Sequence, residues 1–158
     1  MKEKLSRKDL HQLAKTRAAC LCHNLRRSSR AVTRLYDEAM APAGLPANQM
    51  AILVGIALLD RPILSVLAQE MAMDPSTLSR NVKRLERDGL LRIATGAKQR
   101  EKELSLTPKG IRQIKQALPF WAKAQAKLTK RMEPGLQEDV LAALADLTSN
   151  AQAMGKQI

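Results

Sequence analysis

The sequence predicts a mainly α-helical protein with one small β-hairpin, on three observations. Apolar residues recur at three- and four-residue spacing over most of the 158 residues, as on the buried face of a helix. Prolines and glycines fall between these stretches and separate them. The alternation that is typical of strands occurs only near 90–106. We therefore expect helices on both sides of a short central hairpin.

The first half of the chain predicts two helices. One long helix is expected over 9–40, and the segment APAGLPANQ, with two prolines and a glycine, ends it. Residues 48–59 are strongly apolar and indicate a buried helix, which Asp60, Arg61 and Pro62 end. The apolar stripe of the first helix comprises Leu10, Leu13, Leu21, Leu25, Val32 and Leu35.

Two short helices follow, separated by a tight turn at 72–74. The first is expected over 63–71, entered through a brief strand, and the second over 75–87. Asp74 is a good N-cap and Gly89 a good C-terminal stop for the second helix. Two short helices joined in this way are typical of a helix-turn-helix. The buried face of the second helix would comprise Leu78, Val82 and Leu85.

A β-hairpin with a basic tip is expected next. Residues 90–94 indicate one strand, TGAKQREK a polar turn and ELSL a second strand. A helix-turn-helix followed by a hairpin is the order of a winged helix, and helices return after Pro108. The fold class is thus mainly α with a small β-wing. We expect a basic N-terminal arm at 1–8, a winged helix-turn-helix DNA-binding domain at 46–107, and a helical dimerisation region at 9–45 and 108–158.

The charge of the chain indicates a polyanionic partner. It carries 27 Lys and Arg against 15 Asp and Glu, a net charge of +12. Residues 75–112 hold ten of these cations and four acids, so a net +6 lies around the second short helix and the hairpin. Only three aromatic residues are present. Because single-strand and RNA binders usually stack bases on aromatic rings, this scarcity favours double-stranded DNA.

Other classes of protein are not indicated. The longest apolar run, 50–59, is too short to span a bilayer, and the N-terminus shows no secretory pattern. Two cysteines cannot form a disulfide framework, so we expect a cytoplasmic protein without a membrane partner. There is no nucleophile elbow, P-loop or pair of catalytic carboxylates, so neither an enzyme nor a cofactor is expected.

The chain resembles the MarR family of winged-helix transcriptional regulators. The most similar stretches are LAQEMAMDPSTLSRNVKRLERDGLL and REKELSLTPKG, and the spacing of Arg100, Thr107 and Gly110 matches a family hallmark. The resemblance covers about 9–147. It implies a two-fold homodimer, with helix 75–87 in the major groove and the wing in the neighbouring minor groove.

The candidate DNA-binding residues combine the exposed side of helix 75–87 with the wing. Short hydroxyl side chains allow close approach to a base edge, and cations reach phosphates or bases. The resemblance places Arg100 where the wing arginine contacts DNA, and Lys98 stands where the family usually has an aspartate that can brace it. The candidates are Pro75, Ser76, Thr77, Ser79, Arg80, Lys83, Arg84, Lys98, Arg100 and Lys102.

The resemblance implies a sequence-specific regulator, a repressor that binds a pseudo-palindromic operator as a homodimer. The alternative is a non-specific architectural DNA-binding protein. Such proteins often insert apolar wedges between bases, and the tip TGAKQREK offers none, which favours the regulator.

Two kinds of switch are left open. In the family, small-molecule effectors, often aromatic acids, bind between the dimerisation helices and the winged part. The corresponding candidates here are Cys22, Arg26, Tyr36 and Met50, with Val54, Ile114 and Leu118, and Arg26 would pair with a carboxylate.

The alternative is thiol-based oxidant sensing. Cys22 and Tyr36 match the spacing of the OhrR branch, although that branch's second tyrosine would fall at Ala47. Fourteen helical residues span about 21 Å, so Cys22 and Tyr36 would meet only across a dimer. The remaining soft ligands, Cys20, His11 and His23, do not form a zinc site with Cys22.

Overall fold

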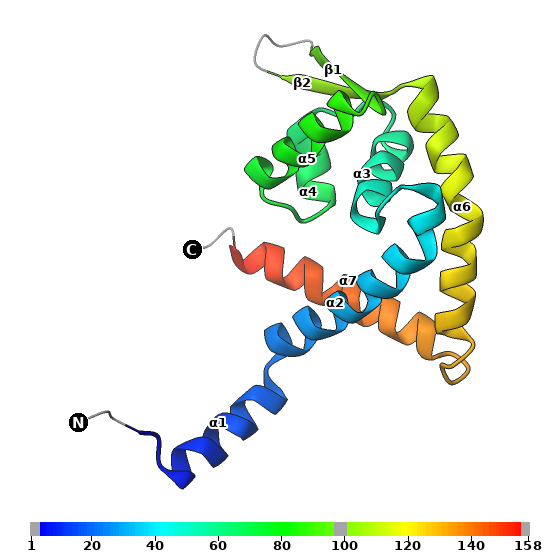
Figure 1. Cartoon of the computed structure of the whole chain (residues 1–158). Helices are drawn as coiled ribbons and strands as arrows, with labels where there is room; N and C mark the ends of the chain where they lie inside the picture. The colour runs from blue at the N-terminus through cyan, green and yellow to red at the C-terminus, as the bar shows by residue number, and fades with distance from the viewer. Residues whose placement is uncertain (1–3, 97–100, 156–158) are drawn as a thin grey trace. The chain divides into compact units, whose positions relative to one another are not determined.

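The computed structural model of the chain describes residues 4–96 and 101–155. The chain divides into two compact units, 1–35 and 36–158, with the boundary inside one helix. The expected fold class is confirmed, since the described residues form helices and one small two-stranded antiparallel sheet (Figure 1). In chain order the elements are α1 (Arg7–Ala19), α2 (Leu21–Met40), the 3-10 helix η1 (Ala41–Ala43), α3 (Ala47–Leu58), α4 (Leu64–Glu70), α5 (Pro75–Arg87), β1 (Leu91–Thr95), β2 (Lys102–Leu106), α6 (Pro108–Thr129) and α7 (Leu136–Gly155).

The N-terminal unit consists of α1 and most of α2. Ser6 starts α1 with a capping box, in which its hydroxyl accepts from the Asp9 N–H (3.2 Å) and the Asp9 carboxylate accepts from the Ser6 N–H (2.9 Å). None of the described side chains of this unit is buried, and Leu10 and Leu13 are 53% and 51% exposed. A short helix without a buried face is only marginally stable by itself.

The expectation of one continuous helix over 9–40 is wrong, because the backbone is extended at Cys20 (φ −76°, ψ 109°). No proline or glycine marks this break in the sequence. The Asn24 amide stabilises it by donating to the carbonyls of Ala18 and Cys20, both at 3.0 Å, which satisfies carbonyls at the end of α1. The Cys20 sulfur in turn accepts from the His23 N–H (3.4 Å), in the position of an N-cap for α2.

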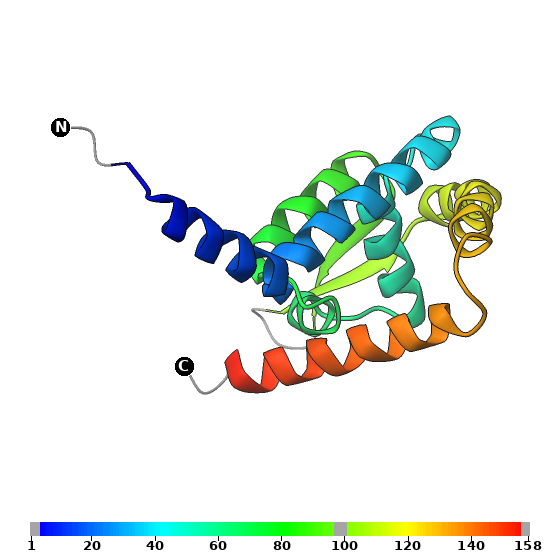
Figure 2. The same ribbon diagram turned by 90° about the horizontal axis from the view of Figure 1, so that it is seen from below.

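The core of the C-terminal unit forms around α3. This helix is apolar along most of its length and contacts α4, α5, α6 and β2. In Figure 2 α6 is seen nearly end-on, with α3 beside it. Full burial of one Leu or Ile side chain stabilises a fold by about 1.5–3 kcal/mol. The largest side chains under 2% exposed are Met40, Leu45, Ile52, Leu53, Ile56, Leu67, Leu78, Leu85, Leu91, Leu104 and Val82.

The hairpin forms where alternation was expected. β1 and β2 pair from Leu91 opposite Leu106 to Thr95 opposite Lys102. The brief strand expected before α4 is a single bridge between Ile63 and Glu103, and the Leu104 N–H donates to the Pro62 carbonyl (2.9 Å). The hairpin is therefore attached to the start of α4 as well as to the end of α5.

The start of α6 is joined closely to the end of α5. Thr107 caps α6 by accepting from the Gly110 N–H (3.0 Å), and its hydroxyl donates to the Gly89 carbonyl (2.7 Å). The Lys109 ammonium donates to the Asp88 carbonyl (2.7 Å). A Cβ at Gly110 would lie only 2.0 Å from the Leu90 carbonyl oxygen. The glycine at 110 thus has a steric cause, and Thr107 is held by its hydrogen bonds. We call these contacts of Thr107, Lys109 and Gly110 with residues 88–90 the α5–α6 joint.

The last helix leaves an apolar stripe uncovered. Leu136, Val140 and Leu144 recur on one face of α7 and are 40–41% exposed. One hydrogen bond joins α7 to α4, from the Gln152 amide to the Gln69 carbonyl (3.2 Å). No single helix of the described residues is long and apolar enough to cross a membrane, although the bent pair 21–43 and 47–58 reaches the required length and composition together.

The close approach at Gly110 predicts a stability effect. Gly110→Ala should lower the free energy of unfolding by about 1–3 kcal/mol, because the added methyl group forces backbone apart in the α5–α6 joint. Urea unfolding at one fixed protein concentration measures the change. The matched control is Gly155→Ala, where a Cβ meets nothing within 4 Å, and a change within about 0.5 kcal/mol is expected there. Equal stability of the two variants would contradict the steric account of the joint.

Candidate nucleic-acid interface

Helix α5 presents one buried and one exposed face. Its bounds agree with the predicted helix over 75–87. Leu78, Val82 and Leu85 are at most 1% exposed, so they anchor the helix in the core. The other face carries hydroxyls in its first turn and cations after them, in the expected order. An exposed helix with this distribution can enter a DNA groove without losing its own packing.

Asp74 organises the first turn of α5. Its carboxylate accepts from the N–H groups of Ser76 (2.9 Å) and Thr77 (3.0 Å) and from the Ser76 hydroxyl (2.5 Å). The Ser76 hydroxyl first and then the Thr77 N–H hold the pKa of Asp74 below its ordinary value of 3.8. The cap therefore stays ionised at neutral pH and fixes the hydroxyl side chains that follow it.

Arg80 is held along the helix surface by a neighbour one turn earlier. Its guanidinium donates to the Thr77 hydroxyl (3.2 Å). Within the described residues no ion pair joins Arg80, Lys83 or Arg84 to a carboxylate. Apart from the electrostatic attraction of Arg80 to Asp74, these cations are not paired with an acid among the described residues, so their donors can meet an anionic partner.

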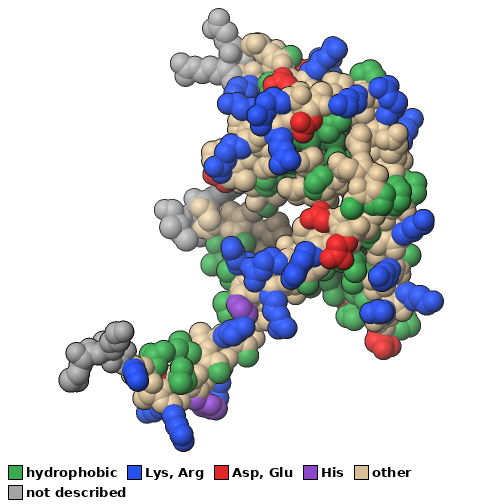
Figure 3. Space-filling view, viewed as in Figure 1, with side chains coloured by type: hydrophobic (Ala, Val, Ile, Leu, Met, Phe, Trp, Pro, Cys, Tyr) green, Lys and Arg blue, Asp and Glu red, His purple; other side chains and the backbone are tan. Residues whose placement is uncertain are grey.

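The hairpin is fixed to α5 as well. The Glu86 carboxylate accepts from the Ile93 N–H (3.0 Å), which joins the helix to β1. On β2, Lys102 is exposed. Figure 3 shows Lys and Arg side chains gathered over the end of the C-terminal unit that carries α5 and the hairpin. This basic surface, from α5 to the hairpin, is the candidate interface.

The predicted DNA-binding residues lie as follows. Pro75, Ser76, Arg80, Lys83 and Arg84 are exposed on α5. Thr77 and Ser79 are half-buried on its flanks. Lys98 and Arg100 lie outside the described residues. Of the α5–α6 joint, sequence reasoning singled out Thr107 and Gly110 but missed Lys109, whose contact with Asp88 spans 21 residues and leaves no local signal.

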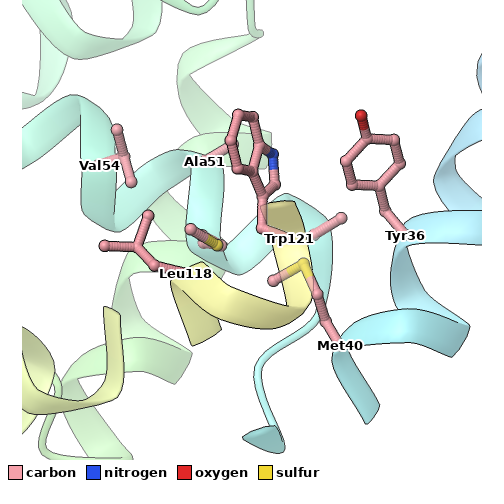
Figure 4. A pocket seen from close by; sticks show the side chains of 8 residues that line it. Tyr36, Met40, Ala51, Val54, Leu118 and Trp121 are labelled. Atoms are coloured by element: carbon pink, nitrogen blue, oxygen red, sulfur yellow. The ribbon is translucent and has the colours of Figure 1, made fainter. Parts of the chain in front are cut away.

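A second feature of the C-terminal unit is a cavity of about 310 Å³ between α2, α3 and α6. Figure 4 shows the rings of Tyr36 and Trp121 on one side of it, with Val54 and Leu118 at the other end. The Tyr36 hydroxyl donates to the Gln125 side chain, and burial raises the pKa of this phenol above 10.0. The lining residues are Tyr36, Met40, Ala47, Met50, Ala51, Val54, Leu118 and Trp121, and none carries a formal charge at neutral pH.

The cavity brings together only part of the predicted effector site. Tyr36 and Met50 line it. Ile114 lines a separate groove between α3, β2 and α6, and Cys22 and Arg26 belong to the N-terminal unit and are not among the lining residues. Sequence reasoning missed Met40 and Trp121, which lie one helical turn after Tyr36 and Leu118 and could have been found by that spacing. Val54 and Leu118 also line the cavity, as expected.

The two thiols have different surroundings. Cys20 is half-buried at the break between α1 and α2, and Cys22 is exposed. His23, near both thiols in the sequence, accepts a hydrogen bond from the Arg17 guanidinium (3.1 Å). Within the described residues no group of three or more His, Cys, Asp or Glu side chains is placed to hold a metal ion.

Comparison with known proteins identifies the family. Residues 43–101 match the model of the MarR family. The chain is 34% identical to the transcriptional regulator MosR of M. tuberculosis, solved in complex with DNA, with a TM-score of 0.75 over 85% of this chain and 98% of that one. No curated protein matches the sequence at a significant level.

Two more distant structures share the fold. PcaV of Streptomyces coelicolor, in complex with its natural ligand, is 21% identical, with a TM-score of 0.76 over 85% of this chain and 95% of that one. CouR of Rhodococcus jostii RHA1, bound to p-coumaroyl-CoA, is 20% identical, with a TM-score of 0.71 over 84% and 94%. The family model matches this chain, and the likeness to MosR covers nearly the whole length of MosR. The chain therefore belongs to the MarR family of transcriptional regulators.

Proposed function

We propose that this MarR-family chain is a repressor that binds a pseudo-palindromic operator as a homodimer and is released by a small-molecule effector. It is a DNA-binding regulator and not an enzyme. The observation that carries this proposal is the exposed face of α5, which presents hydroxyls held in place by Asp74 and cations that form no salt bridge with a described carboxylate. It is supported by the 34% identity of the chain to MosR, a regulator solved in complex with DNA.

In the proposed complex α5 lies in the major groove. Ser76 and Thr77, held at the start of the helix by Asp74, approach base edges together with Arg80. Lys83 and Arg84, further along the same exposed surface, contact phosphates and supply sequence-independent affinity. Pro75 and Ser79 complete this face of the helix. Sequence preference therefore rests mainly on the first two turns of α5.

The wing would contact the neighbouring minor groove. Its strand β2 carries the exposed Lys102, and we assign Arg100 to the groove and Lys98 to a phosphate. The joint between α5 and α6 supports this arrangement, because it fixes the strand that follows α5 in position. We propose that the wing adds affinity, and that α5 supplies most of the discrimination between bases.

The proposed homodimer is supported by apolar surface that a single chain leaves exposed. The α7 stripe of Leu136, Val140 and Leu144 is 40–41% exposed, and no described side chain of the N-terminal unit is buried. Exposed apolar stripes on long helices usually mark an interface. We therefore retain 9–45 and 108–158 as the dimerisation region, with 46–107 as the DNA-binding domain.

The effector would bind in the cavity between α2, α3 and α6. PcaV and CouR are both solved with a ligand, and the cavity here is at the lower end of the usual size of small-molecule sites. We favour this switch over oxidant sensing at Cys22 because the exposed Cys22 thiol makes no hydrogen bond to a described residue. The cavity, in contrast, already has a volume of about 310 Å³ and eight residues that line it.

Two substitutions on α5 test the proposed DNA face. Arg80→Ala should weaken operator binding by about 1–3 kcal/mol and relax preference at one base position, because it removes a base-reading side chain. Lys83→Ala should weaken all duplexes alike and reduce the slope of log affinity against log salt by about 1. Fluorescence anisotropy with labelled duplexes at several salt concentrations measures both.

The control for these variants is Lys130→Ala, which removes one positive charge at the far end of α6. It should leave base preference unchanged and alter affinity far less than Lys83→Ala. If Arg80→Ala and Lys83→Ala both bound DNA like the wild type, the assignment of α5 as the DNA face would be wrong.

The α7 stripe tests the dimer. Introducing two carboxylates with Val140→Asp and Leu144→Asp should weaken dimerisation more than about a hundredfold, because unpaired charges would be buried in the interface. Sedimentation equilibrium measures the dimer. Ala142→Asp, on the opposite face of α7, is the matched control and should remain dimeric. A double variant that stays dimeric would exclude this stripe as the interface.

A further inference from the structure

We infer that the effector of this protein is an uncharged bicyclic aromatic molecule with one hydrogen-bonding oxygen, and not an aromatic acid. The inference rests on the proposed function, in which an effector binds the cavity between α2, α3 and α6. It differs from the expectation drawn from the family resemblance, where a carboxylate would pair with Arg26.

The charge of the cavity wall carries the inference. All eight lining residues are uncharged at neutral pH, and the one titratable group among them, the Tyr36 phenol, is kept protonated by burial. Met40 is fully buried and Met50 is 6% exposed, so this part of the wall is dry. A carboxylate placed here would lose water without gaining a cationic partner among the lining residues.

The size and the rings of the cavity indicate an aromatic ligand. An apolar cavity of about 150 Å³ is enough for benzene, so the 310 Å³ here allow two fused rings. Tyr36 and Trp121 present aromatic rings on one side, against which a flat ligand can stack or pack edge-on (Figure 4). Met40 and Met50 adapt to the shape of whatever ring enters.

Two polar groups of the wall, on Trp121 and Tyr36, are available to one ligand oxygen. The Trp121 indole N–H has no hydrogen-bond acceptor among the described residues, and the indole is 40% exposed. The Tyr36 hydroxyl already donates its hydrogen to Gln125 and keeps a lone pair. A hydroxyl or carbonyl oxygen on the ligand can therefore accept from Trp121, and a ligand hydroxyl can also donate to Tyr36.

A larger groove along the same two helices, α3 and α6, shares Leu118 with the cavity but differs in its charge. It has a volume of about 560 Å³ and includes Asp60, Arg61 and Lys115 in its wall. An anionic compound has cations to meet there, but not in the uncharged cavity. A test must therefore measure binding of an acid at the cavity itself and not to the whole protein.

The test compares 2-naphthol with 2-naphthoate, which share two fused rings and differ in charge at pH 7. Isothermal titration calorimetry on the full-length chain gives the affinity of 2-naphthol, and displacement of bound 2-naphthol gives the affinity of 2-naphthoate for the same site. Wild-type protein should bind 2-naphthol at least about tenfold more tightly than 2-naphthoate, because the acid must bury an unpaired charge.

Ala51→Lys should reduce or reverse this preference, because it places a cation in the cavity wall. Gln116→Lys adds the same charge on the opposite face of α6 and should leave the preference unchanged; residue 116 lines neither cavity. Trp121→Ala, at a half-exposed position, should weaken 2-naphthol at least about fivefold by removing a ring and a donor. Trp121→Ala keeps the inference testable if Ala51→Lys does not fold.

The inference is overturned if 2-naphthoate displaces 2-naphthol with equal or higher affinity, or if 2-naphthol does not bind at all. It is also overturned if 2-naphthol dissociates the dimer in sedimentation experiments, since a second copy would then occupy this wall. DNA binding without ligand is measured in parallel. Its loss would contradict the proposed function, whereas intact DNA binding with a failed titration would contradict only the ligand class.

Discussion

The contact between Gly110 and the Leu90 carbonyl is the constraint on which the rest of the C-terminal unit depends. A side chain at 110 would lie 2.0 Å from that oxygen, so only glycine lets α6 start this close to the end of α5. Thr107 and Lys109 add hydrogen bonds to the same turn. One end of α6 is thereby joined to the proposed reading helix, and residues further along it line the cavity.

This arrangement connects the cavity and the proposed DNA-binding surface through α6. Leu118 and Trp121 line the cavity from α6, and Gln125 on the same helix accepts from Tyr36. A ligand that displaces these side chains would act on a helix whose first turn is joined to residues 88–90, between α5 and β1. The surface of α5 and the hairpin is basic, whereas the wall of the cavity is uncharged. In the function proposed here, the first would bind a polyanion and the second a neutral effector.

Much of the winged part could be predicted because its signals are local. Asp74 and Gly89 set the ends of α5 through short-range backbone geometry, and the bounds 75–87 are confirmed. The break at Cys20 could not be predicted, because it depends on the Asn24 amide and a thiol cap and not on proline or glycine. Arg26 was assigned to the effector site by resemblance alone, and it does not line the cavity.

The cavity shows the same limit of sequence reasoning. Tyr36, Met50, Val54 and Leu118 are expected together from the family resemblance, and all four line the cavity. The absence of charge in the wall became visible only once three helices were packed, because it depends on which residues are brought together across more than 80 positions. Local patterns predict helices and their faces, and tertiary packing decides the chemistry of the space between them.

The most direct test of the central claim, that a homodimer of this chain reads a DNA sequence through α5, is selection of bound duplexes from a random pool. Reduced full-length protein is used at near-physiological salt. The account predicts an inverted repeat whose half-sites lie about one helical turn of DNA, roughly 10–10.5 base pairs, apart. Retention of duplexes that share no motif would contradict it and would indicate a non-specific DNA-binding protein.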